Sequence, residues 1–187
     1  MIFANEIVAS DLCAHGARAL FRVHEPPTAE SVEELAEAMS ALGVQRLRGK
    51  SLDASNVQAL IDSANGIEQK ALVSSLVLRT LQRARYDKDN IGHFGLGSDA
   101  YVHFTSPIRR YPDLVVQRAV AAAFLGDEGF GDLGSEALEV TAELASAREQ
   151  RAVEAERETV ALKKVEFMEA RLGETFPAVS YTHLRAH

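Results

Sequence analysis

The helical period of this chain stops at Tyr86 and does not return until Pro112. Before the break, residues 68–85 are amphipathic, and the spacing predicts a helix that buries Leu72, Leu76, Val77, Leu81 and Ala84. Within the break, glycines at 92, 95 and 97 interrupt the chain, and aromatic residues alternate with histidines. A helical pattern then runs from about Pro112 to Leu125, with a proline well suited to its first position. The chain must therefore fold as helices that hold an irregular segment.

The remaining sequence is also mainly helical. Apolar spacing predicts further helices at 2–15, 28–43, about 53–66 and about 135–172, and alternation predicts a short strand at 19–23. Thr28 is a typical N-cap, Asp53 or Ser55 starts the next helix, and Gly43 and Gly66 are expected to end helices. The face expected to be buried in the first helix carries Phe3, Ile7, Val8 and Leu12. We predict an α+β fold, mainly helical, with short strands and a long C-terminal helix.

The charge of the chain is unevenly distributed. A net charge of −7 and a pI of 5.4 argue, taken alone, against a nucleic-acid-binding protein. Between Arg79 and Arg118, however, seven basic residues stand against four aspartates, a local charge of +3. Such a segment is compatible with a channel for a polyanion, and also with a solvated helix face. No apolar run approaches the roughly 20 residues that span a bilayer, and the single cysteine, Cys13, excludes an internal disulfide. We expect a cytoplasmic protein.

The most informative segment is YVHFTSPIRRYPD at 101–113, which places Arg109 and Arg110 just before a helix N-terminus. Free N–H groups at such a terminus attract anions, and a guanidinium group binds phosphate through two N–H groups. Backbone restriction is expected from Ser106, Pro107 and Pro112, and flat faces for base stacking from Tyr101, Phe104 and Tyr111. In a second interpretation, Arg109 pairs with Asp113 one turn further on, and the aromatic rings fill a core.

Together with GHFGL at 92–96, the run HFTSPIRRYPDL at 103–114 resembles the most distinctive motif of the RNB-family exoribonucleases, the ribonuclease R and ribonuclease II group. Other segments resemble this family in the same order, namely MIFAN at 1–5, ALFRVHEPP at 19–27, LVLRTLQRARYDKDN at 76–90 and QRAVEAERETVALKKVEFMEARLGETF at 150–176. The resemblance covers roughly residues 1–179. It implies that residues 1–172 are the C-terminal part of an RNB catalytic domain and that 173–179 begin an OB-type RNA-binding domain. Residues 180–187, SYTHLRAH, are interpreted as a non-native tail.

The resemblance implies a function. Enzymes of this family hydrolyse single-stranded RNA from its 3′ end, one nucleotide at a time, and release nucleoside 5′-monophosphates. Their Mg²⁺, held by clustered aspartates, activates water, and Arg109 is expected to stabilise the charge that grows on the phosphate. The residues expected to contact RNA are His103, Thr105, Arg110, Tyr111 and Glu156. For the first four a structural role in the loop is an equal alternative, and the polar middle of the long helix, with Glu156, would otherwise simply face water.

Some features depart from the family pattern. The aspartate cluster should lie upstream of the position of Met1, and no zinc or calcium-loop pattern replaces it, so the chain alone is expected to be inactive. Gln117 stands where a histidine is expected, which leaves one helix contact open.

Three hypotheses follow. The first is a fragment of a monomeric exoribonuclease that binds RNA and no membrane, the second a non-catalytic RNA-binding relative, and the third a helical adaptor without a nucleic-acid role.

Overall fold

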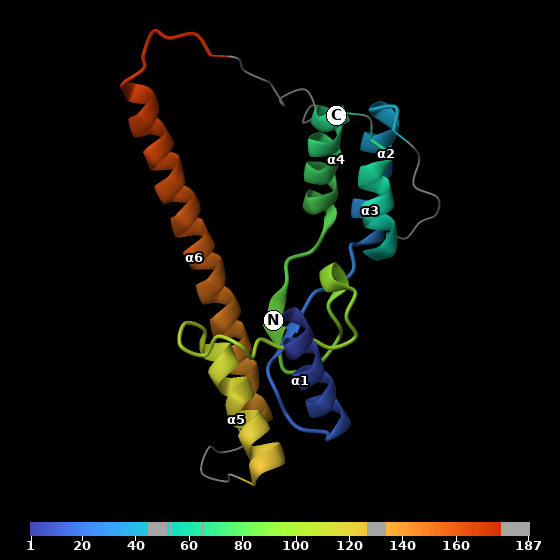
Figure 1. The fold of residues 1–187 in the computed structure, drawn as a ribbon, viewed down its shortest axis with the longest axis vertical. Helices are drawn as coiled ribbons and strands as arrows, with labels where there is room; N and C mark the ends of the chain where they lie inside the picture. The colour runs from blue at the N-terminus through green and yellow to red at the C-terminus, as the bar shows by residue number, and fades with distance from the viewer. Residues whose placement is uncertain (45–51, 53, 65, 127–133, 177–187) are drawn as a thin grey trace. The chain divides into compact units, whose positions relative to one another are not determined.

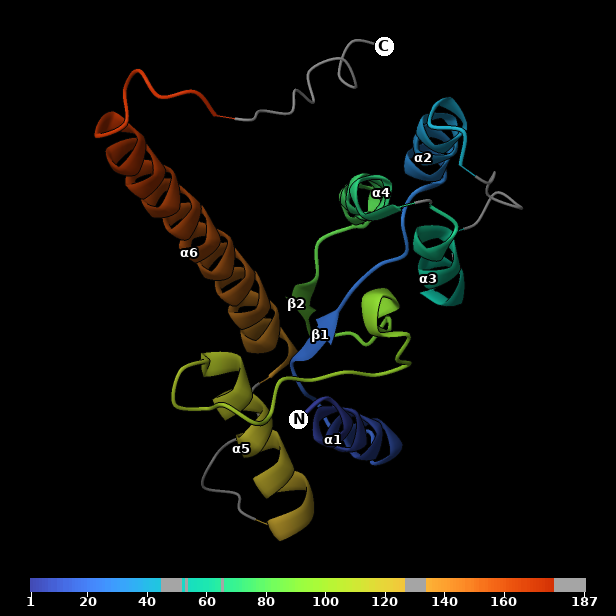
Figure 2. The same cartoon turned by 45° about the horizontal axis from the view of Figure 1, so that its top comes forward.

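The structure is a computed structural model that describes residues 1–44, 52, 54–64, 66–126 and 134–176. It divides into two compact units, residues 1–147 and residues 148–187, which we call unit 1 and unit 2 and describe separately. Figure 1 labels the helices, and Figure 2 shows the same ribbon from a second direction. None of the described helices is both long enough and apolar enough to cross a membrane.

A two-stranded antiparallel sheet lies at the centre of unit 1. Strand β1 (Phe21–Val23) pairs with β2 (Arg85–Asp87), so that Arg22 lies opposite Tyr86 (Figure 2). The segment after the glycines joins this sheet, because the N–H of Arg22 donates to the carbonyl of Tyr101 at 2.8 Å. The strand predicted at 19–23 is therefore confirmed in its second half.

The helix predicted at 68–85 ends earlier than expected. Helix α4 (Gly66–Thr80) stops where the Thr80 hydroxyl donates to the carbonyl of Leu76 at 3.0 Å. Arg85 then belongs to β2 rather than to the helix, because pairing with β1 satisfies its backbone. Gly66, expected to end the preceding helix, has a φ of +76° and is instead the first residue of α4.

One hydrophobic core of unit 1 lies around the sheet, between α1 (Ile2–Ala14), α5 (Tyr111–Leu125) and the first turns of α6 (Ser135–Glu169). Its largest fully buried apolar side chains include Leu12, Leu20, Val23, Val102 and Val116. The face predicted for α1 is correct at Leu12 but wrong at Phe3 and Ile7, which are 73% and 45% exposed. The polar side chain of Asn5 is buried in their place, and its hydrogen bonds, described below, explain why.

A second core is formed by three helices, α2 (Ala29–Ala41), α3 (Ala54–Asp62) and α4, of which α4 packs against the other two (Figure 1). It is built from Val32, Leu35, Met39, Val44, Leu52, Leu60, Ala64, Val73 and Val77. The N-cap prediction is confirmed, because the Thr28 side chain accepts the N–H of Ser31 at 3.2 Å. Of the two residues predicted to start the next helix, Asp53 lies outside the described residues, and Ser55 is the second residue of α3.

The two C-terminal helices have nearly the predicted bounds. Helix α5 begins with Tyr111 and Pro112 and ends before Gly126, which adopts a left-handed conformation with φ +66°. Helix α6 ends at Glu169, three residues before the predicted end. In unit 1 its Ser146 hydroxyl accepts the N–H of Tyr86 at 2.9 Å, and in unit 2 nearly every residue of the helix is exposed.

Candidate functional site

The two adjacent arginines lie in a tight turn that leads into α5. We call residues 105–110 the arginine turn. The carbonyl of Ser106 accepts the N–H groups of Arg109 and Arg110 at 3.3 and 3.2 Å, which folds the backbone back on itself. The Arg109 side chain is exposed and has no hydrogen bond or ion pair with the described part of the chain. The arginine turn therefore presents one free guanidinium group to solvent.

A buried carboxylate fixes the arginine turn. Asp113 is 0% exposed, and its Oδ1 accepts the Ser106 N–H at 2.7 Å and a guanidinium N–H of Arg110 at 2.8 Å. The pairing of Arg109 with Asp113, predicted by the second interpretation, is not formed. Arg110 takes this role because it is the N-cap residue of α5, three residues before the carboxylate in the first turn of the helix.

Asn5 and Gln117 hold the segment that precedes the arginine turn. The Asn5 amide nitrogen donates to the Tyr101 hydroxyl at 2.9 Å, and its oxygen accepts the N–H of Phe104 at 3.3 Å. Gln117, the residue that departs from the family pattern, donates to the carbonyl of Phe104 at 3.1 Å. Side chains from α1 and α5 thus bind both backbone groups of Phe104.

His103 lies within a cluster of rings, which limits what it can do. Its Nδ1 shares a hydrogen bond of 2.9 Å with the hydroxyl of Tyr86, and its ring meets those of Tyr86 and Tyr101 edge to face. Burial, and then the nearby charges of Arg110 and Arg22, lower the pKa of His103 to about 4. The ring is therefore neutral near pH 7 and offers hydrogen bonds rather than charge.

The other aromatic side chains differ in exposure. Tyr101 is 6% exposed, so its ring fills the core as the second interpretation expected. Phe104 is partly buried against the same core, whereas Tyr111 is 53% exposed and leaves its ring accessible. The hydroxyl of Thr105 is buried without a hydrogen-bond partner among the described residues. Of the three rings, Tyr111 is thus the one with an open face for stacking.

The glycine segment is tied to the sheet through His24. The imidazole Nε2 lies 2.7 Å from the carbonyl of Gln82, and Nδ1 accepts the N–H of Gly95 at 2.8 Å. Since a carbonyl can only accept and an N–H can only donate, the ring carries its hydrogen on Nε2. A Cβ on Gly95 would lie 2.7 Å from that Nδ1, so only glycine fits there without displacing the ring. The neighbouring His93 is half-buried, and this burial is the main cause that lowers its pKa to about 4.

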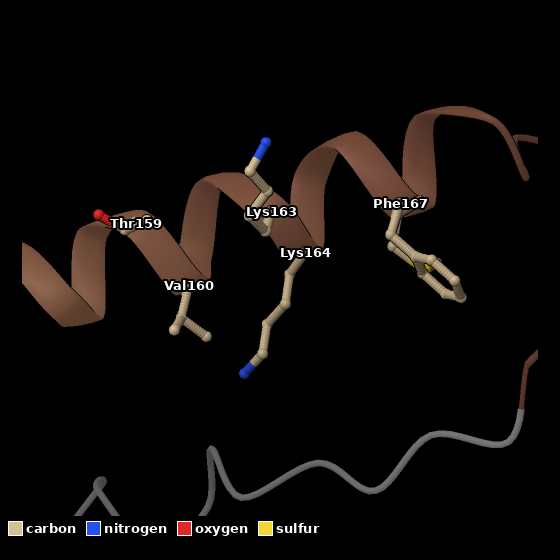
Figure 3. A pocket seen from close by; sticks show the side chains of 6 residues that line it. Thr159, Val160, Lys163, Lys164 and Phe167 are labelled. Atoms are coloured by element: carbon tan, nitrogen blue, oxygen red, sulfur yellow. The ribbon is translucent and has the colours of Figure 1, made fainter.

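Glu156 belongs to unit 2, where it is exposed on α6. Further along this helix, a shallow apolar pocket is lined by Thr159, Val160, Lys163, Lys164, Phe167 and Met168. Figure 3 shows Val160, Lys164 and Phe167 projecting from the same side of the helix. Within unit 2, Lys163 and Glu166 form an ion pair at 2.7 Å, three residues apart on the helix.

The described residues do not form a metal site. Across the described ranges from residue 1 to residue 176, no group of three or more His, Cys, Asp or Glu side chains could hold an ion. Asp87 binds the guanidinium of Arg85 and accepts the N–H of Asp89. Burial alone would raise the pKa of Asp87, but these hydrogen bonds lower it below its usual range.

Comparison with known proteins identifies the family. Residues 1–126 match the model of the RNB domain, and the chain therefore belongs to the RNB family. Its curated relatives include Ribonuclease R 1 of Lactococcus lactis, 39% identical over 96% of this chain and 22% of that protein. Ribonuclease R of Aquifex aeolicus is 42% identical over 94% of this chain and 25% of that protein. The chain thus spans about a quarter of the length of these relatives.

Solved structures agree with this assignment. RNase R of Mycoplasma genitalium, in complex with ribose-methylated single-stranded RNA, matches with a TM-score of 0.86 and 27% identity over 94% of this chain and 28% of that one. Yeast Ssd1, described as a pseudonuclease, matches with a TM-score of 0.64 and 26% identity over 76% of this chain and 18% of that one. The mainly helical fold with two short strands and a long C-terminal helix is confirmed.

The sequence pattern singles out the two arginines but not most of the residues that hold them. Asn5 could have been noticed as a polar residue among the apolar positions of the first helix, where a buried amide needs partners. His24 carried no comparable signal, because its two partners come from segments far away in the sequence.

Proposed function

We propose that the protein to which this chain belongs is a processive, hydrolytic 3′→5′ exoribonuclease that acts on single-stranded RNA and releases nucleoside 5′-monophosphates. The observation that carries the proposal is the free guanidinium group of Arg109 on a turn fixed by a buried carboxylate. Membership of the RNB family and the ribonuclease R relatives support it.

The proposed role of Arg109 follows from its geometry. Hydrolysis of a phosphodiester increases the negative charge on the phosphate oxygens, and a cation held in advance at that place lowers the barrier without reorganising. A guanidinium group suits this task because it donates two parallel N–H bonds to phosphate. Arg109 has both its donors and its charge available, since it is exposed and no described carboxylate pairs with it.

The surrounding residues are proposed to position the RNA or the turn. Tyr111 has an exposed ring on which a base can stack, and the buried Thr105 hydroxyl has a free donor. His103 is proposed to act as a neutral hydrogen-bonding group, and Arg110 to hold the turn through Asp113. Glu156 is proposed to lie near the bound 3′ end.

Metal chemistry is proposed to come from outside the described residues. Nucleases of this family are generally metal-dependent. We propose that the parent protein binds Mg²⁺. Its ligands are proposed to lie in the region of the parent that corresponds to the part of the relatives not covered by this chain. We further propose that the chain alone is inactive, that residues 1–172 and 173–179 belong to the catalytic and an OB-type domain, and that the parent is a cytoplasmic monomer.

The decisive test uses Arg109→Ala in the full-length parent protein. We expect RNA cleavage at saturating RNA to slow by about 10²–10³-fold, while the Kd for RNA rises by less than about tenfold because other contacts remain. Arg148→Ala is the matched control, since it removes an exposed arginine from unit 2. A cleavage rate within a few-fold of the wild type for Arg109→Ala would refute the catalytic assignment.

A second function, RNA binding without cleavage, is favoured by the match to a protein described as a pseudonuclease. The two functions differ in one measurement: a wild-type parent that binds single-stranded RNA with a steep salt dependence but does not shorten it would be a binding protein. A parent that does not bind RNA at any salt concentration would be neither, and would instead support the helical adaptor.

A further inference from the structure

A single carboxylate oxygen ties together the two ends of the arginine turn. Asp113 Oδ1 accepts from the backbone of Ser106 at 2.7 Å and from the side chain of Arg110 at 2.8 Å, and Arg109 lies between these two anchors. We propose that Asp113 is a positioning residue for RNA hydrolysis, which acts by holding Arg109 in a fixed orientation. This inference rests on the proposed function and names a residue through which it works.

The geometry of the turn explains how Asp113 acts at a distance from the reacting atoms. The turn contains its own backbone bonds from Arg109 and Arg110 to Ser106, but these close it only locally. Asp113 is in the first turn of α5, so its bonds attach the turn to a helix. A side chain presented from a rigid element loses less orientational freedom when it binds, and misplacement by about 1 Å can cost 10²-fold in rate.

Charge leads to the same role. Two neighbouring arginines would both attract phosphate, but Asp113 pairs with Arg110 and leaves Arg109 as the unpaired cation of the turn. The carboxylate is fully buried, which is costly unless it is paired and hydrogen-bonded. Its position in the first turn of a helix also favours negative charge. Asp113 thus makes Arg110 a structural partner in the turn and leaves Arg109 available to bind phosphate.

The carboxylate also contains an unused oxygen that makes substitution informative. Asp113 Oδ2 and Arg110 Nε are buried without hydrogen-bond partners among the described residues. In Asp113→Asn the remaining oxygen can still accept from Ser106 and Arg110, but the new NH₂ group is buried without a described acceptor and the charge that balances Arg110 is lost. The turn is expected to loosen while the side-chain volume stays the same.

The test is a double-mutant cycle in the full-length parent protein, made from Asp113→Asn and Arg109→Ala and read as single-turnover cleavage at saturating RNA. Asp113→Asn alone should slow cleavage by about 10- to 100-fold with a Kd for RNA within about threefold of wild type. In the Arg109→Ala background it should cause less than about a threefold further loss, because the residue it positions is gone. Asp99→Asn, an exposed aspartate, is the control and should leave the rate unchanged.

The outcomes separate the alternatives. Equal losses in both backgrounds would mean that Asp113 supports the fold and not Arg109, and would overturn the inference. If Asp113→Asn shows no thermal unfolding transition, Arg110→Ala replaces it in the same cycle, and independent losses there would overturn it equally. A wild-type parent that does not hydrolyse RNA would refute the proposed function, and the role of Asp113 with it. If the wild-type parent hydrolyses RNA but the two substitutions slow cleavage independently of each other, the proposed function stands and only the role of Asp113 is refuted.

Discussion

The irregular segment of unit 1 and the second half of α6 reach a defined structure by opposite means. Between Tyr86 and Tyr111 there is little regular backbone, and side chains distant in the sequence supply the hydrogen bonds, such as Asn5 to Tyr101 and His24 to Gly95. From Arg148 to Glu169 the backbone satisfies itself as a helix, and side-chain contacts such as Lys163 to Glu166 and Thr159 to Ala155 span three or four residues. Irregular chain can therefore be the more constrained of the two regions.

This difference places the strongest sequence requirements in the segment without secondary structure. A helix tolerates many residues at an exposed position, whereas a side chain that binds two partners in a core can be replaced by few others. The sequence of unit 1 contains three tyrosines, Tyr86, Tyr101 and Tyr111, and no tryptophan, so tyrosine emission can follow this segment.

The largest loss of stability is expected at Gly95, where the irregular segment leaves no space for a side chain. Gly95→Ala should lower the free energy of unfolding by about 2 to 4 kcal/mol, because the new Cβ would overlap His24, which two hydrogen bonds hold in place. Urea unfolding followed by tyrosine emission measures this. Gly134→Ala is the matched control, with no heavy atom within 4 Å of the new Cβ. Equal stabilities of the two variants would contradict the proposed constraint.

The next effect contrasts a buried with an exposed amide. Asn5→Ala should destabilise unit 1 by about 2 kcal/mol, since it leaves the Tyr101 hydroxyl and the Phe104 N–H without their partner. Gln150→Ala on the exposed surface of α6 should change stability by less than about 0.5 kcal/mol. Urea unfolding followed by far-ultraviolet circular dichroism, which reports helices of both units, measures both variants, and a larger loss from Gln150→Ala would reverse the comparison.

Acid should affect unit 1 before the second half of α6. The folded chain binds protons on His93 and His103 only near pH 4, whereas the ordinary value is 6.5. The unfolded state therefore takes up more protons between these values, so stability is fully present above pH 6.5 and falls toward pH 4. With solvent screening the loss should be about 1 to 2 kcal/mol.

Two spectroscopic signals test this prediction. Near-ultraviolet circular dichroism of the tyrosines should change between pH 6.5 and 4, while the far-ultraviolet signal of the helices is largely kept. No histidine occurs between Arg148 and Phe176, so this stretch contains no corresponding group. His103→Gln should flatten the response, and an unaltered response would show that His103 is not its source.

The smallest effect is expected in unit 2. Lys163→Ala breaks an ion pair with Glu166 whose side chains are 69% and 50% exposed, and it should cost less than about 0.5 kcal/mol. Helix content measured in low and high salt checks this, because an exposed pair is screened. A loss above 1 kcal/mol would indicate that the second half of α6 depends on specific side-chain contacts as unit 1 does.

The same contrast explains what could be predicted from the sequence. Periodicity identified α2, α5 and α6 because local spacing decides them. It placed the end of α4 too late, because Arg85 leaves the helix to pair with a strand far away in the sequence. It also placed Phe3 in the core, because periodicity counts apolar residues and cannot weigh the two hydrogen bonds of Asn5.

The candidate site divides in the same way. The prolines and the helix N-terminus predicted an arginine turn before α5, and the described side chain of Arg109 is exposed as that prediction requires. The sequence alone does not decide whether Arg109 or Arg110 pairs with Asp113, because pairs three and four residues apart both form in helices. The path of the backbone in the structure shows that it is Arg110. The roles of the individual residues in RNA hydrolysis stay predictions.

The His24 ring has a consequence for hydrogen exchange. The ring has a hydrogen on one nitrogen and a lone pair on the other. It therefore donates to the Gln82 carbonyl and accepts from the Gly95 N–H, as the N–H and C=O groups of a neighbouring strand would. The Gly95 amide should therefore exchange with deuterated water as slowly as amides inside a sheet, although Gly95 belongs to neither β1 nor β2. A side chain would then protect a main-chain group as a neighbouring strand does.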